Sequence, residues 1–223
     1  MALRPSPLHT VLALAAAAAL LPAVPAAANS LDVNEFAAIC GGGGTACNGS
    51  SCGLETILVD QGNAYVESDH PVEEPRISVK VCFDANGVTL PPRPNGSPGR
   101  FRLMKFYREQ GNNPRQHLFL TLKRNQTNSQ YRLAVLQRNA GGTFEFVGEF
   151  FWGNGTHELE IVWDKTAGTG RVEVLRDGVV RASRDVDLTG WNVDMVRMGA
   201  IDEIDAGVAG SVYYDQYVST RPP

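Results

Sequence analysis

The chain has 223 residues, of which 43% are hydrophobic and 20% are charged, a composition typical of one globular domain with a buried core. Its formal net charge is −4 at neutral pH, and no stripe of lysines and arginines stands out. Nucleic acid is therefore not expected as a partner, because binding to it depends on a basic surface.

Residues 1–28 have the layout of a secretory signal peptide. Arg4 gives a positive start, an apolar run follows, and "PAVPAAA" ends the segment in small residues. The apolar run is short for a bilayer span, although a retained membrane anchor is the alternative interpretation. Cleavage near Ala28 would leave a chain of net charge −5, because only Arg4 is removed. We expect this chain to be exported to the periplasm or the medium, and it contains no later transmembrane segment.

Residues 29–53 form a lead-in rich in glycine and cysteine, which we expect to be flexible and held by crosslinks. An even number of cysteines in an exported chain indicates two disulfides, here with three possible pairings among Cys40, Cys47, Cys52 and Cys82. We favour Cys40–Cys47 and Cys52–Cys82, because the first pair closes a short glycine-rich loop. A metal site is the alternative, but no histidine or second cysteine pair lies nearby.

From Leu54 onward the pattern is that of short strands rather than helices. "RISVKVCF" (76–83) and "HELEIVW" (157–163) alternate apolar and other residues, and "RVEVLRDGVVRASRDV" (171–186) predicts a hairpin with its turn at Asp177-Gly178. Similar runs occupy residues 54–60, 64–68, 100–107, 116–123, 131–137, 144–151, 193–200 and 210–219. About twelve strands at this spacing predict an all-β, two-sheet antiparallel sandwich over residues 54–221.

Four stretches carry a resemblance to a known superfamily: "HELEIVWD", "GRVEVLRDGVV", "VDMVRMGAID" and "AGVAGSVYYDQYVSTR". Their order and spacing resemble the concanavalin A-like lectin/glucanase superfamily, in particular the small laminin-G-like domains of exported bacterial proteins. The resemblance implies a jelly roll whose concave face forms a ligand groove. It leaves the activity open, because the superfamily includes lectins, hydrolases, lyases and interaction modules.

The stretch "AIDEIDAG" (200–207) raises the question of catalysis, because it places Glu203 and Asp205 two residues apart. The glucan hydrolases of the superfamily carry Glu-x-Asp-x-Glu on one strand, so that all three carboxylates share a face. Here Gly207 stands where the third acid belongs, and glycines follow closely. We therefore interpret the segment as a solvated connection between strands and assign no catalytic residue.

Candidate ligand-binding residues come from two other stretches. In "TFEFVGEFFWGNG" (143–155), Glu145 and Glu149 are predicted to share a strand face beside Phe151 and Trp152, where the acids could accept sugar hydroxyls and the aromatic rings could stack on a sugar. The alternative is that the apolar residues face the core and the acids are merely exposed. Trp191, in "LTGWNVD", is either an exposed sugar platform or an anchor for its loop.

These observations give a leading hypothesis and two alternatives. The leading one is a secreted, non-catalytic jelly-roll module that binds a glycan or another surface ligand through its concave face or rim loops. The alternatives are a divergent polysaccharide hydrolase or lyase, and a structural or adhesive domain without a small ligand. We predict no cofactor: calcium is conceivable in this superfamily, but the sequence lacks the closely spaced aspartates that would bind it.

Overall fold

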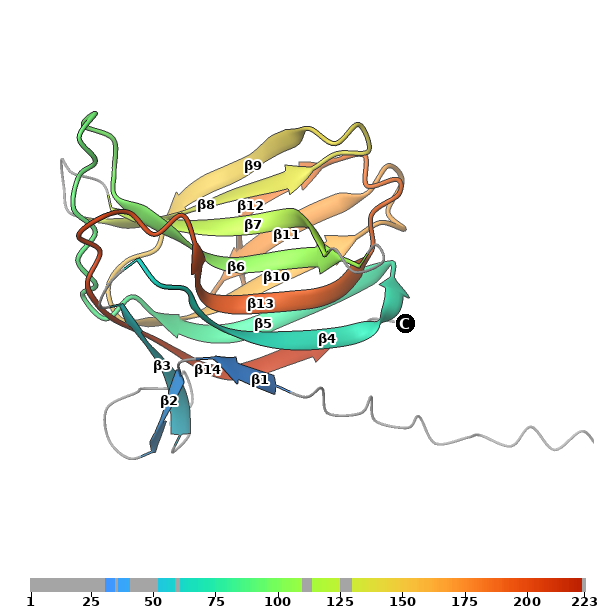
Figure 1. Ribbon diagram of the computed structural model, residues 1–223. Helices are drawn as coiled ribbons and strands as arrows, with labels where there is room; N and C mark the ends of the chain where they lie inside the picture. The colour runs from blue at the N-terminus through green and yellow to red at the C-terminus, as the bar shows by residue number, and fades with distance from the viewer. Residues whose placement is uncertain are drawn as a thin grey trace, which may run out of the picture.

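The computed structural model describes residues 31–34, 36–40, 52–58, 61–109, 114–124 and 130–221. Within these residues the chain is all-β and forms two seven-stranded antiparallel sheets that pack face to face (Figure 1). The predicted two-sheet sandwich is confirmed. The predicted signal peptide lies outside the described residues, as does Cys47. No helix in the described part of the chain could span a membrane.

The first sheet, here sheet A, has the strand order β1-β4-β13-β6-β7-β8-β9. Its strands are β1 (Leu31–Asn34), β4 (Ala64–Glu74), β6 (Arg100–Arg108), β7 (Arg115–Arg124), β8 (Tyr131–Arg138), β9 (Phe144–Phe151) and β13 (Val193–Asp202).

The second sheet, sheet B, has the strand order β12-β11-β10-β5-β14-β3-β2. Its strands are β2 (Phe36–Cys40), β3 (Cys52–Leu58), β5 (Arg76–Asp84), β10 (Thr156–Asp164), β11 (Arg171–Arg176), β12 (Val179–Asp185) and β14 (Gly210–Thr220).

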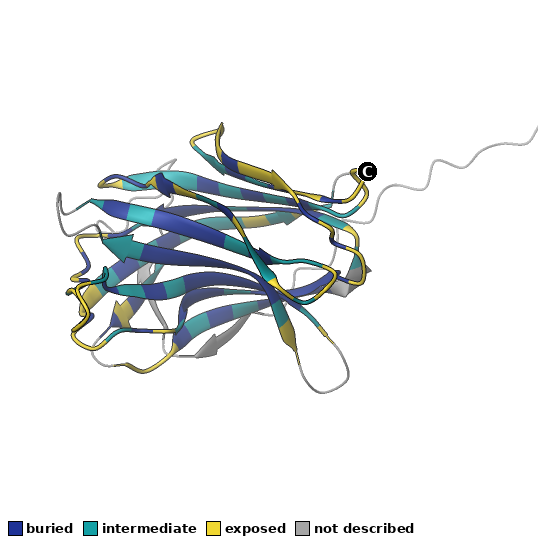
Figure 2. Ribbon diagram, turned by 90° about the horizontal axis from the view of Figure 1, so that it is seen from above, coloured by how far each residue is buried: buried dark blue, intermediate teal, exposed yellow. Residues whose placement is uncertain are grey.

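The core lies between the two sheets and follows the alternation seen in the sequence. On β10, Leu159, Ile161 and Trp163 are fully buried, and each stands opposite an equally buried residue of β5, such as Val79 or Val81. Because successive side chains of a strand point to opposite faces, this pairing builds one apolar layer. Figure 2 shows buried positions along the strands and exposed ones chiefly at the turns.

The predicted hairpin is confirmed at β11–β12. Asp177 and Gly178 both have positive φ, at 53° and 73°, as a tight two-residue turn requires. Sheet pairing begins earlier in the chain than the sequence predicted. The strands β1 and β2, inside the 29–53 lead-in, pair with β4 and β3.

The two sheets meet along one side of the sandwich, where edge strand β9 of sheet A lies against edge strand β12 of sheet B. Arg184 of β12 joins them. Its guanidinium donates a hydrogen bond to the carbonyl of Phe146 at 3.0 Å and forms an ion pair with Glu145 at 2.9 Å. This contact between β9 and β12 is called the seam below.

Candidate functional site

The part of the acidic stretch that holds Glu203 and Asp205 is a connection between strands, as predicted, whereas residues 200–202 form the end of β13. Strand β13 ends at Asp202, and Glu203 and Asp205 precede β14. Asp205 accepts two hydrogen bonds from Arg93, at 2.7 and 2.8 Å, and Glu203 forms ion pairs with Arg100 and Arg102. Each carboxylate is thus paired with at least one arginine. These pairs hold the connecting segments together and do not leave two acids facing an open cleft.

The prediction that Glu145 and Glu149 share a face is wrong, and the cause is a β-bulge in β9. Opposite β8, Gly148 pairs with Val135 and Phe146 pairs with Leu136, so Val147 is an extra residue. The bulge shifts the alternation by one. Glu149 consequently stands opposite Ala134 on the outside of sheet A, whereas Glu145 stands opposite the fully buried Gln137 and pairs with Arg184 of sheet B.

Both acids are already engaged. Glu145 also accepts a hydrogen bond from the Asn139 amide at 2.9 Å. Glu149 lies 3.0 Å from the Lys123 ammonium and 3.3 Å from the Arg132 guanidinium. Partial burial acts to raise the pKa of Glu149, but these two cations outweigh it and hold the pKa below its usual range. The role of either acid in ligand binding stays a prediction.

The two candidate tryptophans are both buried. Trp152 has no exposed surface and packs against Phe83, Phe150 and His157, so its proposed stacking on a sugar is wrong. Trp191 is 6% exposed, and its indole N–H donates to the carbonyl of Asn139 at 2.8 Å. The alternative interpretation, that Trp191 anchors its loop, therefore holds.

The outer face of sheet A, turned away from sheet B, is rich in cations and tyrosines. Along β6, Met104 and Phe106 join the core, while Lys105 and Tyr107 lie on the opposite face. Arg197 of β13 lies beside them, with its guanidinium carbon 4.8 Å from the centre of the Tyr107 ring. This arrangement combines positive charge with aromatic surface on one sheet.

Ion pairs on this face balance part of its charge. Lys105 has a nearly buried side chain and contacts the Asp202 carboxylate, which is also 3.5 Å from Arg102. Burial lowers the pKa of Lys105, and Asp202 opposes that shift. Arg197 is paired with Glu67 at 2.6 Å. The paired carboxylates fix these cations in position.

Three cations, Lys105, Arg115 and Arg138, come together where β6, β7 and β8 meet at one end of this face. A pocket of about 360 Å³ opens there, called the cationic pocket, lined by Lys105, Tyr107, Pro114, Arg115, Gln116 and Arg138. No carboxylate belongs to this described lining. Burial lowers the pKa of Arg138, and the nearby charge of Arg115 lowers it further. A bound anion would relieve that repulsion.

The other polar groups of the cationic pocket can donate hydrogen bonds. Burial raises the pKa of Tyr107 to about 12, more than Arg197 lowers it, so its hydroxyl is protonated at neutral pH. Gln116 stands directly opposite Tyr107 in the sheet and adds an amide. The Nε of Arg138 is buried and has no hydrogen-bond partner in the described part of the chain. The pocket is thus equipped for an acidic, hydroxyl-bearing ligand.

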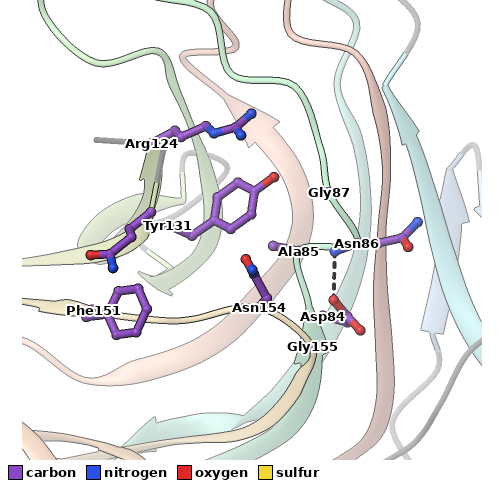
Figure 3. A pocket seen from close by; sticks show the side chains of 10 residues that line it. Asp84, Ala85, Asn86, Gly87, Arg124, Tyr131, Phe151, Asn154 and Gly155 are labelled. Atoms are coloured by element: carbon purple, nitrogen blue, oxygen red, sulfur yellow. Dashed lines mark hydrogen bonds between the residues drawn. The ribbon is translucent and has the colours of Figure 1, made fainter. Parts of the chain in front are cut away.

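A second pocket opens at the opposite end of β7 and β8 and is called the end pocket (Figure 3). Its volume is about 670 Å³, and it is lined by Asp84, Ala85, Asn86, Gly87, Arg124, Gln130, Tyr131, Phe151, Asn154 and Gly155. The lining comes from the ends of β5, β7, β8 and β9, from the loops that follow β5 and β9, and from Gln130 just before β8.

Sequence reasoning missed both pockets. Their residues come from several strands, and the register that brings Gln116 opposite Tyr107 includes a bulge between Phe106 and Tyr107 that no local pattern signals. Three lining residues of the end pocket, Phe151, Asn154 and Gly155, do lie within the stretch 143–155 that the sequence singled out. For metals, the described residues contain no group of three or more histidine, cysteine, aspartate or glutamate side chains that could hold an ion.

Cys82 is disulfide-bonded. The side chains of the other three cysteines lie outside the described residues, so the predicted pairing of Cys52 with Cys82 and of Cys40 with Cys47 stays a prediction.

No protein-family model matches the chain, and no curated protein matches it by sequence. Solved structures do match by fold. The receptor-binding domain of botulinum neurotoxin D superposes with a TM-score of 0.53 at 9% identity, covering 86% of this chain and 44% of that one. The binding domain of botulinum neurotoxin DC in complex with SialylT superposes with a TM-score of 0.56 at 8% sequence identity. The match covers 86% of this chain and 42% of that one. The chain therefore spans less than half the length of these neurotoxin domains.

Alginate lyases match as well. An alginate lyase from Pseudomonas aeruginosa gives a TM-score of 0.52 at 10% identity, covering 76% of this chain and 83% of that one. The alginate lyase AlyC3 in complex with dimannuronate superposes with a TM-score of 0.51 at 8% sequence identity. The match covers 75% of this chain and 74% of that one. At these identities the likeness establishes a shared jelly-roll-like sandwich and nothing about activity. The narrower relationship to laminin-G domains stays a prediction.

Proposed function

We propose that the protein is an exported glycan-binding module that holds an acidic saccharide in the cationic pocket. The observation that carries the proposal is the convergence of Lys105, Arg115 and Arg138 on one pocket whose described lining contains no carboxylate. Guanidinium groups bind carboxylates through paired, charge-assisted hydrogen bonds. Tyr107 and Gln116 supply neutral donors for sugar hydroxyls and ring oxygens.

Two further observations support this assignment. The matched structures include neurotoxin binding domains, one in complex with SialylT, and alginate lyases, one in complex with dimannuronate, a sugar acid. The disulfide at Cys82 supports export, because such bonds persist in oxidising compartments. A glycan at the surface of a cell or in the medium is the partner that this combination favours.

The proposal is tested by measuring the binding of the protein to polymannuronate and to a neutral β-glucan, by calorimetry at low and at moderate salt. We expect binding to polymannuronate that weakens as salt rises, since charge pairs on an exposed surface are screened. The R115Q and R138Q variants should each weaken it several-fold. The matched control is R181Q, which removes the same charge from an exposed position on sheet B. Equal affinity for both polymers, or equal affinity in R115Q, R138Q and R181Q, would contradict the proposal.

A lyase is the second candidate, because the hydroxyl of Tyr107 lies in the same pocket as two arginines. In such a reaction a base removes the proton α to the uronate carboxylate, the arginines neutralise that carboxylate, and the glycosidic C–O bond breaks to leave a carbon–carbon double bond. The high pKa of Tyr107 makes it a poor base at neutral pH, which favours binding without cleavage. Ultraviolet absorbance of an unsaturated uronate product, lost in Y107F, would favour the lyase instead.

A further inference from the structure

We propose that the end pocket is a second ligand site, separate from the cationic pocket, and that it takes a neutral, hydroxyl-rich saccharide. The two pockets lie at opposite ends of the same strands. On β7, Arg115 lines the cationic pocket and Arg124 lines the end pocket; on β8 the corresponding residues are Arg138 and Tyr131. Strand β7 has ten residues, and the axial rise per residue of a β-strand therefore places the two sites about 30 Å apart.

The charge of the end pocket sets it apart from the cationic pocket. Its described lining has one carboxylate, Asp84, and one guanidinium, Arg124, with the side-chain amides of Asn86, Gln130 and Asn154. The formal charges of this lining cancel, so its net charge favours neither an anionic nor a cationic ligand. A sugar hydroxyl both donates and accepts hydrogen bonds. The amides supply donors and acceptors for it, and the carboxylate supplies further acceptors.

The polar wall of the pocket is organised without a ligand. One oxygen of Asp84 accepts a hydrogen bond from the backbone N–H of Asn86 at 2.7 Å, and the other accepts one from the hydroxyl of Thr156 at 3.1 Å. Each carboxylate oxygen has a further lone pair for a ligand. The Tyr131 hydroxyl donates to the carbonyl of Val88 at 2.6 Å, which fixes its ring in the wall. A ligand would therefore meet groups already held in place.

Phe151 provides an apolar platform at the same pocket. This phenylalanine is 43% exposed, unlike most of the large apolar side chains of the domain, and lies at the end of β9 beside the loop that carries Asn154 (Figure 3). An exposed ring next to amides and a carboxylate matches the two surfaces of a sugar, whose C–H face packs on an aromatic ring while its hydroxyls are hydrogen-bonded at the rim.

Backbone is accessible on two sides of the pocket. Gly87 and Gly155 both have positive φ, and an added Cβ at either position would meet no atom within 4 Å. Glycine is required there by the turn conformation, and the open space beside it lets a ligand approach the main chain closely. With a volume of about 670 Å³, the pocket lies within the usual range for small-ligand sites.

The experiment is saturation-transfer NMR of the full chain against a panel of glucose, galactose, mannose, N-acetylglucosamine and their common disaccharides. We expect transfer to at least one of these neutral sugars, reduced at least fivefold in F151A and in N154A. The matched control is F146A, which removes a similarly exposed phenylalanine from the same strand outside the pocket. Asn154 is exposed and not in the core, so N154A tests the site even if F151A fails to fold.

The absence of transfer to every sugar of the panel would overturn the inference, as would transfer that F151A and N154A both leave at the wild-type level. The outcome is independent of the acidic site, because R115Q should weaken polymannuronate binding and leave transfer to the neutral sugar unchanged. Loss of both signals in R115Q would show that one site serves both ligands, which also contradicts the inference.

Discussion

Arg93 and Asp205 form a two-point ion pair, in which Nε lies 2.8 Å from Oδ2 and a terminal nitrogen lies 2.7 Å from Oδ1. The same carboxylate accepts a hydrogen bond from the backbone N–H of Arg100 at 2.9 Å. The carboxylate of Asp205 thereby ties the proline-rich loop at 91–100 to the connection that follows β13. Its role is structural, although the acid-rich sequence around it raises the question of catalysis.

Replacing this carboxylate should cost stability and leave glycan binding unchanged. We expect D205N to lower the free energy of unfolding by about 1–2 kcal/mol, a value at the lower end for a charged pair because Arg93 is partly exposed. Chemical denaturation of D205N, R93Q and the double variant should give a coupling energy of about 0.5–1 kcal/mol. Additive single effects, or loss of polymannuronate binding in D205N at an unchanged fold, would contradict this role.

Next to the bulge in β9, Gly148 approaches strand β12 of the other sheet closely. A Cβ added there would lie 2.7 Å from the Cβ of Ala182 on β12, closer than two non-bonded carbon atoms can approach without a shift. We expect G148A to lower the free energy of unfolding by about 1–3 kcal/mol through overpacking, and A182G to recover part of that loss. Thermal or urea denaturation measures both effects.

A matched control for this substitution is G141A. Gly141 also has no positive φ, and an added Cβ would meet only the Asn139 side chain, at 3.4 Å. We expect a stability change within about 0.5 kcal/mol, as for most surface substitutions. Equal stability of G148A and G141A would show that the close contact with Ala182 does not require glycine at position 148.

Stability should fall as the pH drops below 6.5, because two buried histidines are neutral in the fold. Burial lowers the pKa of His117 to about 3, and burial assisted by Arg221 lowers that of His70 to about 4. Between those values and 6.5 the unfolded chain binds more protons than the folded one. Between pH 7 and pH 5 we expect each histidine to lower the free energy of unfolding by about 2 kcal/mol.

Urea denaturation at the two pH values measures this loss. The H117Q variant should have a lower stability at pH 7 and a smaller difference between pH 7 and pH 5, because one titrating group has been removed. An unchanged pH difference in H117Q would assign the acid sensitivity to other groups.

The disulfide pairing can be read from the oxidised protein. We expect a non-reducing digest, analysed by mass spectrometry, to contain Cys52 linked to Cys82 and Cys40 linked to Cys47. The C82S variant should lower the free energy of unfolding by about 3 kcal/mol, because the crosslink restricts the unfolded chain. Linkage of Cys82 to Cys40 or Cys47 would contradict the predicted pairing.

Alternation in the sequence predicted the fold because burial on one face imposes a period of two. It succeeded on β10, where Leu159, Ile161 and Trp163 all reach the core. It failed on β9, where Val147 is inserted and the faces of Glu145 and Glu149 separate. The insertion accompanies a contact with Ala182, some 34 positions along the chain, so no local pattern could reveal it.

The two pockets were beyond sequence reasoning for a related reason. Tyr107 and Gln116 meet through the register of β6 and β7, which a bulge alters, while Arg138 arrives from a third strand. Single arginines and glutamines are ordinary on the exposed face of a strand. Only their convergence, set by the register of β6 with β7 and the register of β7 with β8, distinguishes them from neighbours that merely face water.

The seam between β9 and β12 bears on how the protein behaves at high concentration. An edge strand with unpaired carbonyls is a template on which another molecule can add a strand and start a growing aggregate. Here Arg184 occupies the carbonyl of Phe146 and pairs with Glu145, and a bulge bends β9 beside it. An incoming chain would have to displace a charged side chain and match an irregular edge. This side of the sandwich is thereby protected against self-association.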